Sequence, residues 1–401
     1  MKLVVFNKET TIFDVLFALL VFTIPISFAL PNVFLALAFV VFLVKKNKEK
    51  INTYVKLVLL FAGFFILKAL LNKELLENFF MYKHVIVFVV ISLLTFNIKN
   101  INLVKKGFVL GTLSAVLFTI SQIVIYYINY DSIPLGNTAE AGELLIVHRP
   151  YFGFICFLGV MCSTQLIQTA KSLKETIFYK IVITLFIVFV YLIVARLALG
   201  LVIIYLFITL LQRDNLSKKK LLPLIGVFIS LLLLLVINNK NIKKRLHIEN
   251  TLSKTVKIIS NQEPRVVIWS CFFEAIKKPN FNYFTGYNDV KNIQLILNDC
   301  YKNSIKNVSK KEYYLKTKFN THNQFFDFFL QGGAIGLTLF LTILGFSFYA
   351  CRFNFTSLFV FIGFMLFLIV ENLFHRQIGV YLIGIFIPLF LKRKGEQNYG
   401  D

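Results

Sequence analysis

The stretch HNQFFDFFLQGGAIGLTLFLTILGFSFYA, residues 322–350, joins a polar segment to an apolar run long enough to cross a membrane. About 20 apolar residues in a helix span the roughly 30 Å of hydrocarbon in a bilayer. His322 and Asn323 stand at the mouth of this run. An imidazole at a membrane surface can exchange protons near neutral pH. The stretch therefore predicts a membrane helix with a titratable ring at one end.

The whole chain has the composition of a membrane protein. Hydrophobic residues make up 57% of its 401 residues, and it contains 46 Phe, whereas soluble domains are about 45–50% apolar. The formal net charge of +23 would also suit a nucleic-acid-binding protein, but no basic segment is combined with a nucleic-acid fold signature. We therefore expect an all-α polytopic membrane protein with no nucleic-acid partner. The apolar stretch after Lys8 has no Ala-x-Ala site, so we expect it to remain as the first span.

Hydropathy predicts about twelve transmembrane helices. They lie near residues 11–28, 31–45, 54–72, 79–96, 107–128, 150–168, 178–195, 197–212, 221–238, 324–349, 354–371 and 377–391. Lys and Arg gather in every second short loop, as in residues 45–50 and 99–106. Because such loops are retained in the cytoplasm, the pattern predicts that both termini are cytoplasmic.

A long polar segment, residues 239–323, separates the ninth and tenth predicted spans on the outer side. A segment of this length is usually functional. The chain is predicted to divide into residues 1–238 with spans one to nine, a partly helical outer (periplasmic) subdomain at 239–323, and residues 324–401 with the last three spans and a cytoplasmic tail. The outer segment is basic, which suits either a solvated surface at the lipid headgroups or an electrostatic funnel for an anionic substrate.

Within this outer segment, residues 264–276 have helical periodicity, with Pro264 suited to the first turn. Arg265 and Trp269 are four residues apart and should share one face of that helix. Cys271 and Cys300 both lie in the segment, where oxidation is possible, and a bridge between them is left open. The remaining cysteines are expected to be packing residues in or beside spans: Cys156, Cys162 and Cys351.

These motifs together carry a resemblance, spread over roughly residues 145–390. It rests on Arg265-x-x-x-Trp269 followed by Pro279 and Gly286, and on His322-Asn323 with nine residues before Gly333-x-x-Gly336. In this order and spacing they resemble the bacterial O-antigen ligase and polymerase superfamily. Arg196 stands in a short turn similar to that family's Ser-Arg turn, with Ala195 in place of Ser, and Glu371-Asn372 resembles a recurrent acidic-polar pair.

The resemblance implies glycosyl transfer at the outer face of the bacterial inner membrane, among membrane lipids. The donor would be a glycan linked to undecaprenyl pyrophosphate, and the acceptor a hydroxyl of lipid A-core or another glycan. An O-antigen or exopolysaccharide polymerase uses the same donor chemistry and is the alternative. A second alternative is a polysaccharide transporter or flippase, which would place ionisable groups deep within the spans.

The leaving group in such a transfer is a pyrophosphate, and the planar fork of Arg suits phosphate better than Lys does. Arg265 and Arg196 are the candidate catalytic cations, and Arg149 and Arg376, at predicted outer ends of spans, are candidates for substrate binding. His322 is the candidate general base, because neighbouring arginines favour its neutral ring. Three further residues complete the predicted substrate-binding set: Asn323, Trp269 and Glu371.

The outer segments show no acidic cluster with metal-ligand spacing. We therefore expect a transfer that uses no metal and no other cofactor. Arginines would then stabilise the leaving group in a direct displacement that inverts the anomeric centre.

Overall fold

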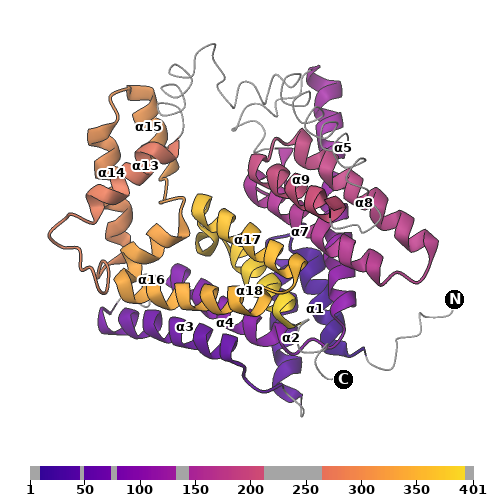
Figure 1. Ribbon diagram of the computed structural model, residues 1–401. Helices are drawn as coiled ribbons and strands as arrows, with labels where there is room; N and C mark the ends of the chain where they lie inside the picture. Colours follow the sequence, from indigo (N-terminus) through magenta and orange to yellow (C-terminus); the bar gives the residue numbers. More distant parts are fainter. Residues whose placement is uncertain (1–9, 46–48, 74–78, 132–143, 212–263, 393–401) are drawn as a thin grey trace. The chain divides into compact units, whose positions relative to one another are not determined.

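The computed structural model describes residues 10–45, 49–73, 79–131, 144–211 and 264–392, and the named elements within these ranges are all helices (Figure 1). Contacts divide the chain into two compact units. The first comprises Met1–Leu16, Val33–Ile101 and Asn261–Asp401, and the second comprises Phe17–Asn32 and Asn102–Ser260.

The apolar helices coincide with the predicted spans. They are α1 Ile12–Thr23, α2 Leu30–Val44, α3 Thr53–Leu71, α4 Phe79–Thr95, α5 Ile101–Tyr130, α7 Arg149–Gln168, α8 Leu173–Leu192, α9 Arg196–Leu211, α16 Gln324–Cys351, α17 Phe355–Val370 and α18 Gln377–Lys392. Among the described residues, α3, α5, α7, α8 and α16 are long and apolar enough to cross a membrane, and the others are shorter. The protein is thus a polytopic helical membrane protein. The predicted ninth span, 221–238, and the start of the outer segment, 239–263, lie outside the described residues.

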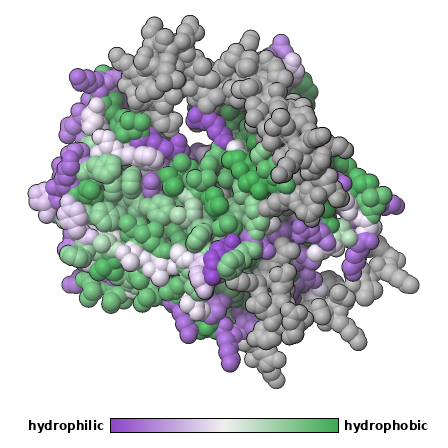
Figure 2. All heavy atoms as spheres, in the orientation of Figure 1, coloured by the Kyte–Doolittle hydropathy of each residue, from purple (hydrophilic) through white to green (hydrophobic). Residues whose placement is uncertain are grey.

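Large apolar side chains lie exposed along these helices, as the green surface in Figure 2 shows. On α3 they include Leu60, Leu67 and Leu71. Contiguous apolar surface of this kind is unfavourable in water and marks a face that contacts lipid. Burial inside the molecule therefore explains only part of the hydrophobic content, and contact with the bilayer explains the rest.

An aromatic cluster forms the core of the first unit. Phe61 of α3 lies 5.1 Å from Phe328 of α16, and Phe328 lies 5.0 Å from Phe374, measured between ring centroids. Phe88 of α4 lies 5.1 Å from Phe374 on another side. Aromatic rings at such distances stabilise one another beyond the burial of their area. Because Phe374 belongs to η2, the short helix Leu373–His375 between α17 and α18, the cluster fixes that connection on three membrane helices.

The predicted span 324–349 is not one continuous helix. α16 breaks at Gly333, whose φ of 58° and ψ of −156° are not helical. Residues 281–287 of the outer segment lie against the break and supply hydrogen bonds to the backbone groups that it leaves without helical partners. These bonds run from Ala334 N–H to Tyr283 O at 2.8 Å, from Ile335 N–H to Phe284 O at 3.1 Å, and from Tyr287 N–H to Leu330 O at 2.8 Å. A backbone group without a partner is costly in a membrane, so the outer segment makes the break possible.

Lys68 of α3 completes this arrangement. Its buried Nζ donates to Thr285 O at 2.5 Å, to Tyr287 O at 2.8 Å and to Gln331 O. A lysine ammonium has three donors, and all of them are used here.

The part of α16 after Gly333 is roughly 27 Å long at 1.5 Å per residue. That is close to the thickness of the hydrocarbon, so residues 324–332 are not needed to cross it.

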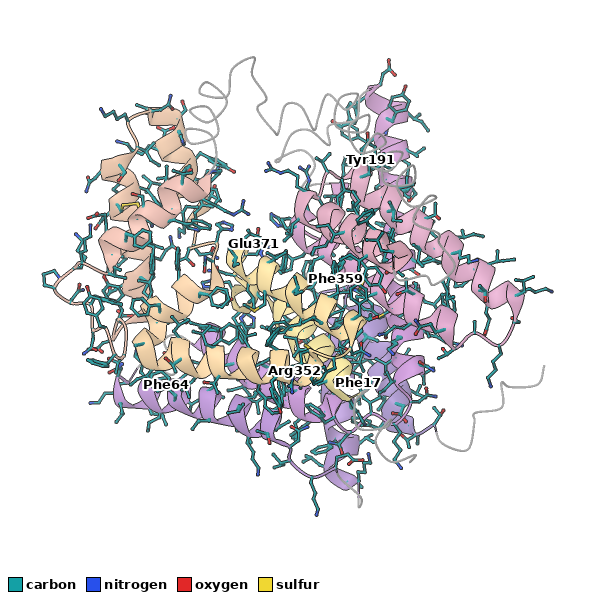
Figure 3. All side chains as sticks on the ribbon, in the orientation of Figure 1. Phe17, Phe64, Tyr191, Arg352, Phe359 and Glu371 are labelled. Atoms are coloured by element: carbon teal, nitrogen blue, oxygen red, sulfur yellow. A yellow bond between two sulfur atoms is a disulfide. The ribbon has the colours of Figure 1, made fainter. Side chains whose placement is uncertain are left out.

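Close packing on the other side of α16 uses two more glycines. An added Cβ on Gly332 would lie 2.8 Å from the ring of Phe65, and one on Gly336 would lie 3.0 Å from the same ring. The neighbouring Phe64 is labelled on α3 in Figure 3. Small residues thus allow α16 to approach α3 closely.

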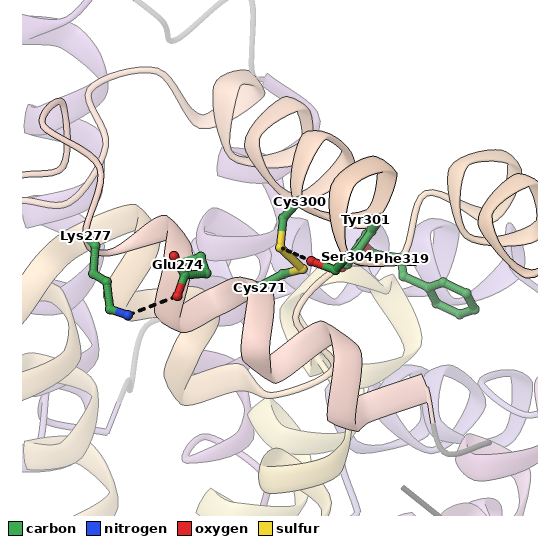
Figure 4. Close-up of a disulfide and its surroundings, with 7 residues drawn as sticks. All are labelled: Cys271, Glu274, Lys277, Cys300, Tyr301, Ser304 and Phe319. Carbon is green, nitrogen blue, oxygen red and sulfur yellow. Dashed lines mark hydrogen bonds and ion pairs between the residues drawn. A yellow bond between two sulfur atoms is a disulfide. The ribbon is translucent and has the colours of Figure 1, made fainter. Parts of the chain in front are cut away.

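Three helices form the described part of the outer segment: α13 Pro264–Ala275, α14 Val290–Ser304 and α15 Val308–Thr317. α13 begins at Pro264, as predicted. Cys271 and Cys300 form a disulfide with a Cα–Cα distance of 5.6 Å (Figure 4), which settles the question that the sequence left open. Around it lies an apolar core that includes Ile268, Phe272, Leu297, Tyr301 and Tyr314. The predicted division at residues 239 and 323 stays a prediction.

The second unit is organised around α7. Most of α7 is buried, from Tyr151 to Ser163, and it contacts both α8 and α9. An added Cβ on Gly159 would lie 2.6 Å from the ring of Phe186 on α8. The cysteines of α7, Cys156 and Cys162, are buried, and so is Cys351 of α16. They are packing residues, as expected.

The break in α16 makes a specific prediction for stability. A Cβ added to Gly333 would lie 2.3 Å from the backbone of Phe284, at a φ that L-residues rarely adopt. We expect Gly333→Ala to destabilise the protein by about 2 kcal/mol or more. Gly345→Ala on the same helix, where an added Cβ meets nothing within 4 Å, should be neutral or stabilising. Thermal unfolding of the two purified variants tests this, and equal midpoints would contradict the account of the break.

Candidate active site

The carboxylate of Glu371 lies between two predicted catalytic side chains. Its Oε1 is 3.5 Å from Nη2 of Arg265, and its Oε2 is 3.4 Å from Nδ1 of His322. Glu371 is buried at the end of α17, where Figure 3 labels it, whereas the side chains of Arg265 and His322 are 29% and 23% exposed. Three segments distant in the sequence therefore meet at one carboxylate.

Arg265 also holds the end of α17. Its Nε and Nη2 donate to the carbonyl oxygen of Val370 at 3.2 and 3.1 Å. Val370 is the last residue of α17, where backbone carbonyls lack helical partners and attract cations. Arg265 thus anchors α13 to α17 and partly neutralises Glu371 in the same position.

The backbone of His322 is held in an unusual conformation. Its φ is 43°, in the left-handed region. The N–H of His322 donates to Oδ1 of Asn320 at 3.0 Å, and its ring lies 5.6 Å from the ring of Phe319. A non-glycine residue at positive φ stores strain, and such residues concentrate at functional sites. The turn directs the imidazole toward Glu371.

Trp269 and Asn372 hold Thr321, the residue before His322, in place. Nε1 of Trp269 donates to the carbonyl oxygen of Thr321 at 3.2 Å, and Nδ2 of Asn372 donates to Oγ1 of Thr321 at 2.9 Å. Trp269 was expected at the substrate, and the structure gives it this supporting contact. Thr321 and Asn372 are buried. Sequence reasoning did not assign a role to Thr321.

Asn323 caps α16. Its Oδ1 accepts from the N–H groups of Phe325 and Phe326 at 3.0 and 3.1 Å. This is the usual N-cap role of asparagine, and it accounts for the buried position of the side chain. The structure therefore gives Asn323 a local partner, whereas the sequence placed it in the predicted substrate-binding set.

A second imidazole–carboxylate pair joins α16 to the connection between α17 and α18. Nε2 of His375 lies 2.9 Å from both carboxylate oxygens of Asp327. Arg376, predicted at the substrate, follows His375 and is exposed. Sequence reasoning missed the pair, although a carboxylate in an apolar run is costly in a membrane and was a usable signal. Within the described ranges, no group of three or more His, Cys, Asp or Glu side chains could hold a metal ion.

Arg149 and Arg196 belong to the second unit. They are the first residues of α7 and α9, and an added Cβ on Gly153 of α7 would lie 2.4 Å from Cβ of Ala195, beside Arg196. The two arginines thus share one end of this helix pair. The structure brings together Arg265, His322 and Glu371 in the first unit, and Arg149 and Arg196 in the second.

The turn before Arg196 is tight. Val194 has a φ of 54°, and the N–H of Ala195 donates to Val190 O at 3.2 Å. α8 ends at Leu192 and α9 begins at Arg196, so residues 193–195 alone separate the two helices. Positive φ is strained for a β-branched residue. The sequence predicted a turn with almost no loop, and the structure shows how this turn is made.

The region that contains these features matches a family model. Residues 181–341 match the model described as O-antigen ligase. The chain is thus similar to the O-antigen ligase family over these residues. The match includes Arg196, Arg265, Trp269, His322 and Asn323 and leaves out Arg149, Glu371 and Arg376. No curated protein matches the chain. Members of the O-antigen ligase family carry out ligase- or polymerase-type transfer of lipid-linked glycans.

The packing of Gly153 predicts how the turn at Arg196 depends on α7. Gly153→Val would overpack the contact with Ala195, typically at a cost of about 1–3 kcal/mol, and should displace the turn. We expect glycan transfer to fall while Gly200→Ala, on α9 where an added Cβ meets nothing within 4 Å, leaves transfer unchanged. Transfer assays normalised to the amount of protein in the membrane test this. Unimpaired transfer by Gly153→Val would contradict the dependence.

Proposed function

We propose that the protein is an O-antigen ligase-like glycosyltransferase. It moves a glycan from undecaprenyl pyrophosphate to an acceptor hydroxyl, such as one of lipid A-core, at the periplasmic face of the bacterial inner membrane. The observation that carries the proposal is the Glu371 carboxylate held between Arg265 and His322. A base, a carboxylate that orients it and a cation then stand within one site.

His322 acts as the general base in this proposal. Because Nδ1 faces Glu371, Nε2 is the nitrogen that accepts the proton of the acceptor hydroxyl. Glu371 orients the ring and stabilises the imidazolium that forms, as a carboxylate does for histidine in hydrolase triads. The acceptor oxygen then forms a bond to the anomeric carbon as the bond from that carbon to the phosphate oxygen breaks.

The electron pair of the broken bond leaves with undecaprenyl pyrophosphate. Arg265, Arg196, Arg149 and Arg376 are the proposed cations for this charge, since guanidinium groups bind phosphate by paired hydrogen bonds. The proposed transfer requires no metal and no other cofactor. A single displacement inverts the anomeric centre, and product with retained configuration would refute that step.

Two features support the periplasmic placement. The Cys271–Cys300 disulfide lies beside the site in sequence, and disulfides persist in oxidising compartments. The Lys and Arg residues of every second short loop are the other feature, because such loops are retained in the cytoplasm and the pattern predicts two cytoplasmic termini. A transporter could use a buried charge such as that of Lys68, but the ammonium group of Lys68 donates hydrogen bonds to three backbone carbonyl groups of the chain.

Ligase and polymerase functions differ in what a deletion leaves behind. The single dominant outer segment favours a ligase, because polymerases more often divide their work between two outer loops. We expect deletion of the gene to remove the glycan ladder from lipid A-core while lipid-linked polymer accumulates. Gel analysis of the glycolipids measures this. A single repeat left on lipid A-core would identify a polymerase instead.

Substitutions at the Glu371 site test the proposed roles. His322→Ala removes the base, and Glu371→Gln keeps the size of the side chain but removes the charge that orients the ring. Each should lower transfer by about 100-fold or more, and Arg265→Ala should do the same. Lys277→Ala, which breaks the exposed pair with Glu274 drawn in Figure 4, should leave transfer unchanged. The amount of protein in the membrane is measured for each variant, and near-normal transfer by His322→Ala would sink the assignment.

A further inference from the structure

The pair formed by His375 and Asp327 has a different environment from the pair formed by His322 and Glu371. Asp327 is buried, with a side chain 3% exposed, and both of its oxygens lie 2.9 Å from Nε2 of His375. Its other contacts are donors as well: Nε2 of Gln331 at 2.7 Å and Nε2 of Gln324 at 3.4 Å. The polar contacts of this buried carboxyl group are thus all with ring or amide nitrogens.

The position of His375 is fixed on both sides. Oε1 of Gln324 accepts from the N–H of Phe374 at 2.9 Å, and the ring of Phe374 belongs to the aromatic cluster. The side chain of His375 is nevertheless 35% exposed. One ring nitrogen is thus engaged by Asp327 while part of the ring faces outward, next to the exposed Arg376.

The charges around the two imidazoles differ. Glu371 divides its interaction between His322 and the guanidinium of Arg265. Among the described residues, the polar side chains that contact Asp327 are His375 and the uncharged amides of Gln324 and Gln331, so its charge is not divided with a second cation. An undivided anion at hydrogen-bond distance favours the protonated imidazole.

The pKa of His375, which lies between α17 and α18, follows this balance. Burial alone would lower the pKa, but the charge and the hydrogen bond of Asp327 outweigh burial and the repulsion by Arg376, so the pKa of His375 is raised above its ordinary value. The other titratable groups that face it come from α4, where His84 interacts with His375 and Lys83 lies beside His84. The positive charge is therefore present below the raised pKa and is lost as the pH rises through it.

We propose that His375 is held as an imidazolium and that, together with Arg376, it binds the pyrophosphate of the lipid-linked donor. The proposal rests on the proposed function and deepens it by naming a second cation beside Arg376. A ring that already carries a proton is a poor acceptor for another, so His375 serves as a cation, and proton acceptance stays with His322. Residues 324–332 are not needed to cross the hydrocarbon, which suits a site at the depth of lipid phosphates.

Binding of undecaprenyl pyrophosphate to the purified full-length protein tests this inference. The measurement is the rise in the thermal midpoint with lipid concentration in an uncharged detergent, with undecaprenol as the ligand that lacks phosphate. We expect His375→Gln to weaken binding about tenfold, the value of one charge-assisted hydrogen bond. His375→Lys keeps a cation beside Asp327 and should restore most of the affinity. Lys302→Gln removes an exposed charge of α14 and should change nothing.

The pH dependence adds a readout that a structural role of His375 would not produce. Wild-type affinity should fall as the pH rises through the raised pKa of His375, and His375→Lys should show no such fall. Asp327→Asn removes the anion that retains the proton, so it should move the fall to lower pH. The midpoint without ligand shows whether each variant is folded.

Three outcomes would overturn the inference. Wild-type affinity in His375→Gln would remove His375 from the site, and equal weakening in His375→Lys and His375→Gln would show that its charge is not what matters. A wild-type protein that does not distinguish undecaprenyl pyrophosphate from undecaprenol would overturn the proposed function as well. If the wild type does distinguish the two lipids and His375→Gln is unchanged, this inference alone fails.

Discussion

The break in α16 at Gly333 is the constraint on which the first unit depends. A helix broken inside a membrane protein leaves carbonyl and N–H groups that water cannot reach, and each must find a partner. Here residues 281–287 and Lys68 provide those partners. The outer helices are consequently joined to the membrane helices by hydrogen bonds to the backbone itself. Such bonds fix position more closely than a lipid-facing surface could, which is what a catalytic constellation needs.

The break also determines where polar side chains can stand. Because the part of α16 after Gly333 nearly matches the hydrocarbon thickness, the part before it can carry Gln324, Asp327 and Gln331 without placing them in lipid. Phe328, between these polar residues, packs into the aromatic cluster with Phe374. One face of this short helical segment is thus held by aromatic packing while another forms hydrogen bonds to residues 371–376. The two imidazole–carboxylate pairs draw their members from opposite segments. α16 supplies the carboxylate of the pair Asp327–His375, whereas the residues just before α16 supply the imidazole of the pair His322–Glu371.

The sequence was sufficient wherever local pattern determines structure. Long apolar runs gave the spans, Pro264 marked the start of α13, and motif order indicated Arg265, His322 and Glu371, which the structure places together. The break at Gly333 was missed because its cause lies about fifty residues earlier in the chain, in partners that no periodicity reveals. The roles of Asn323 and Trp269 were harder to predict from the sequence, for another reason. Both residue types serve as caps or packing groups as readily as ligands, so only the observed contacts with Phe325 and Thr321 distinguish these roles.

The two imidazoles differ in the other groups that contact their carboxylate partners. Arg265 takes part of the charge of Glu371, so the carboxylate that faces His322 has a second cation as its partner. Asp327 directs both oxygens at His375 and otherwise contacts the uncharged amides of Gln324 and Gln331. The same pair of residue types can therefore supply a base at one position and a fixed cation at the other. A transfer from a lipid-linked pyrophosphate needs both, a proton acceptor for the incoming hydroxyl and positive charge for the departing phosphate. Arg265 thus has an effect beyond its own charge, because it takes part of the charge of the carboxylate that faces His322.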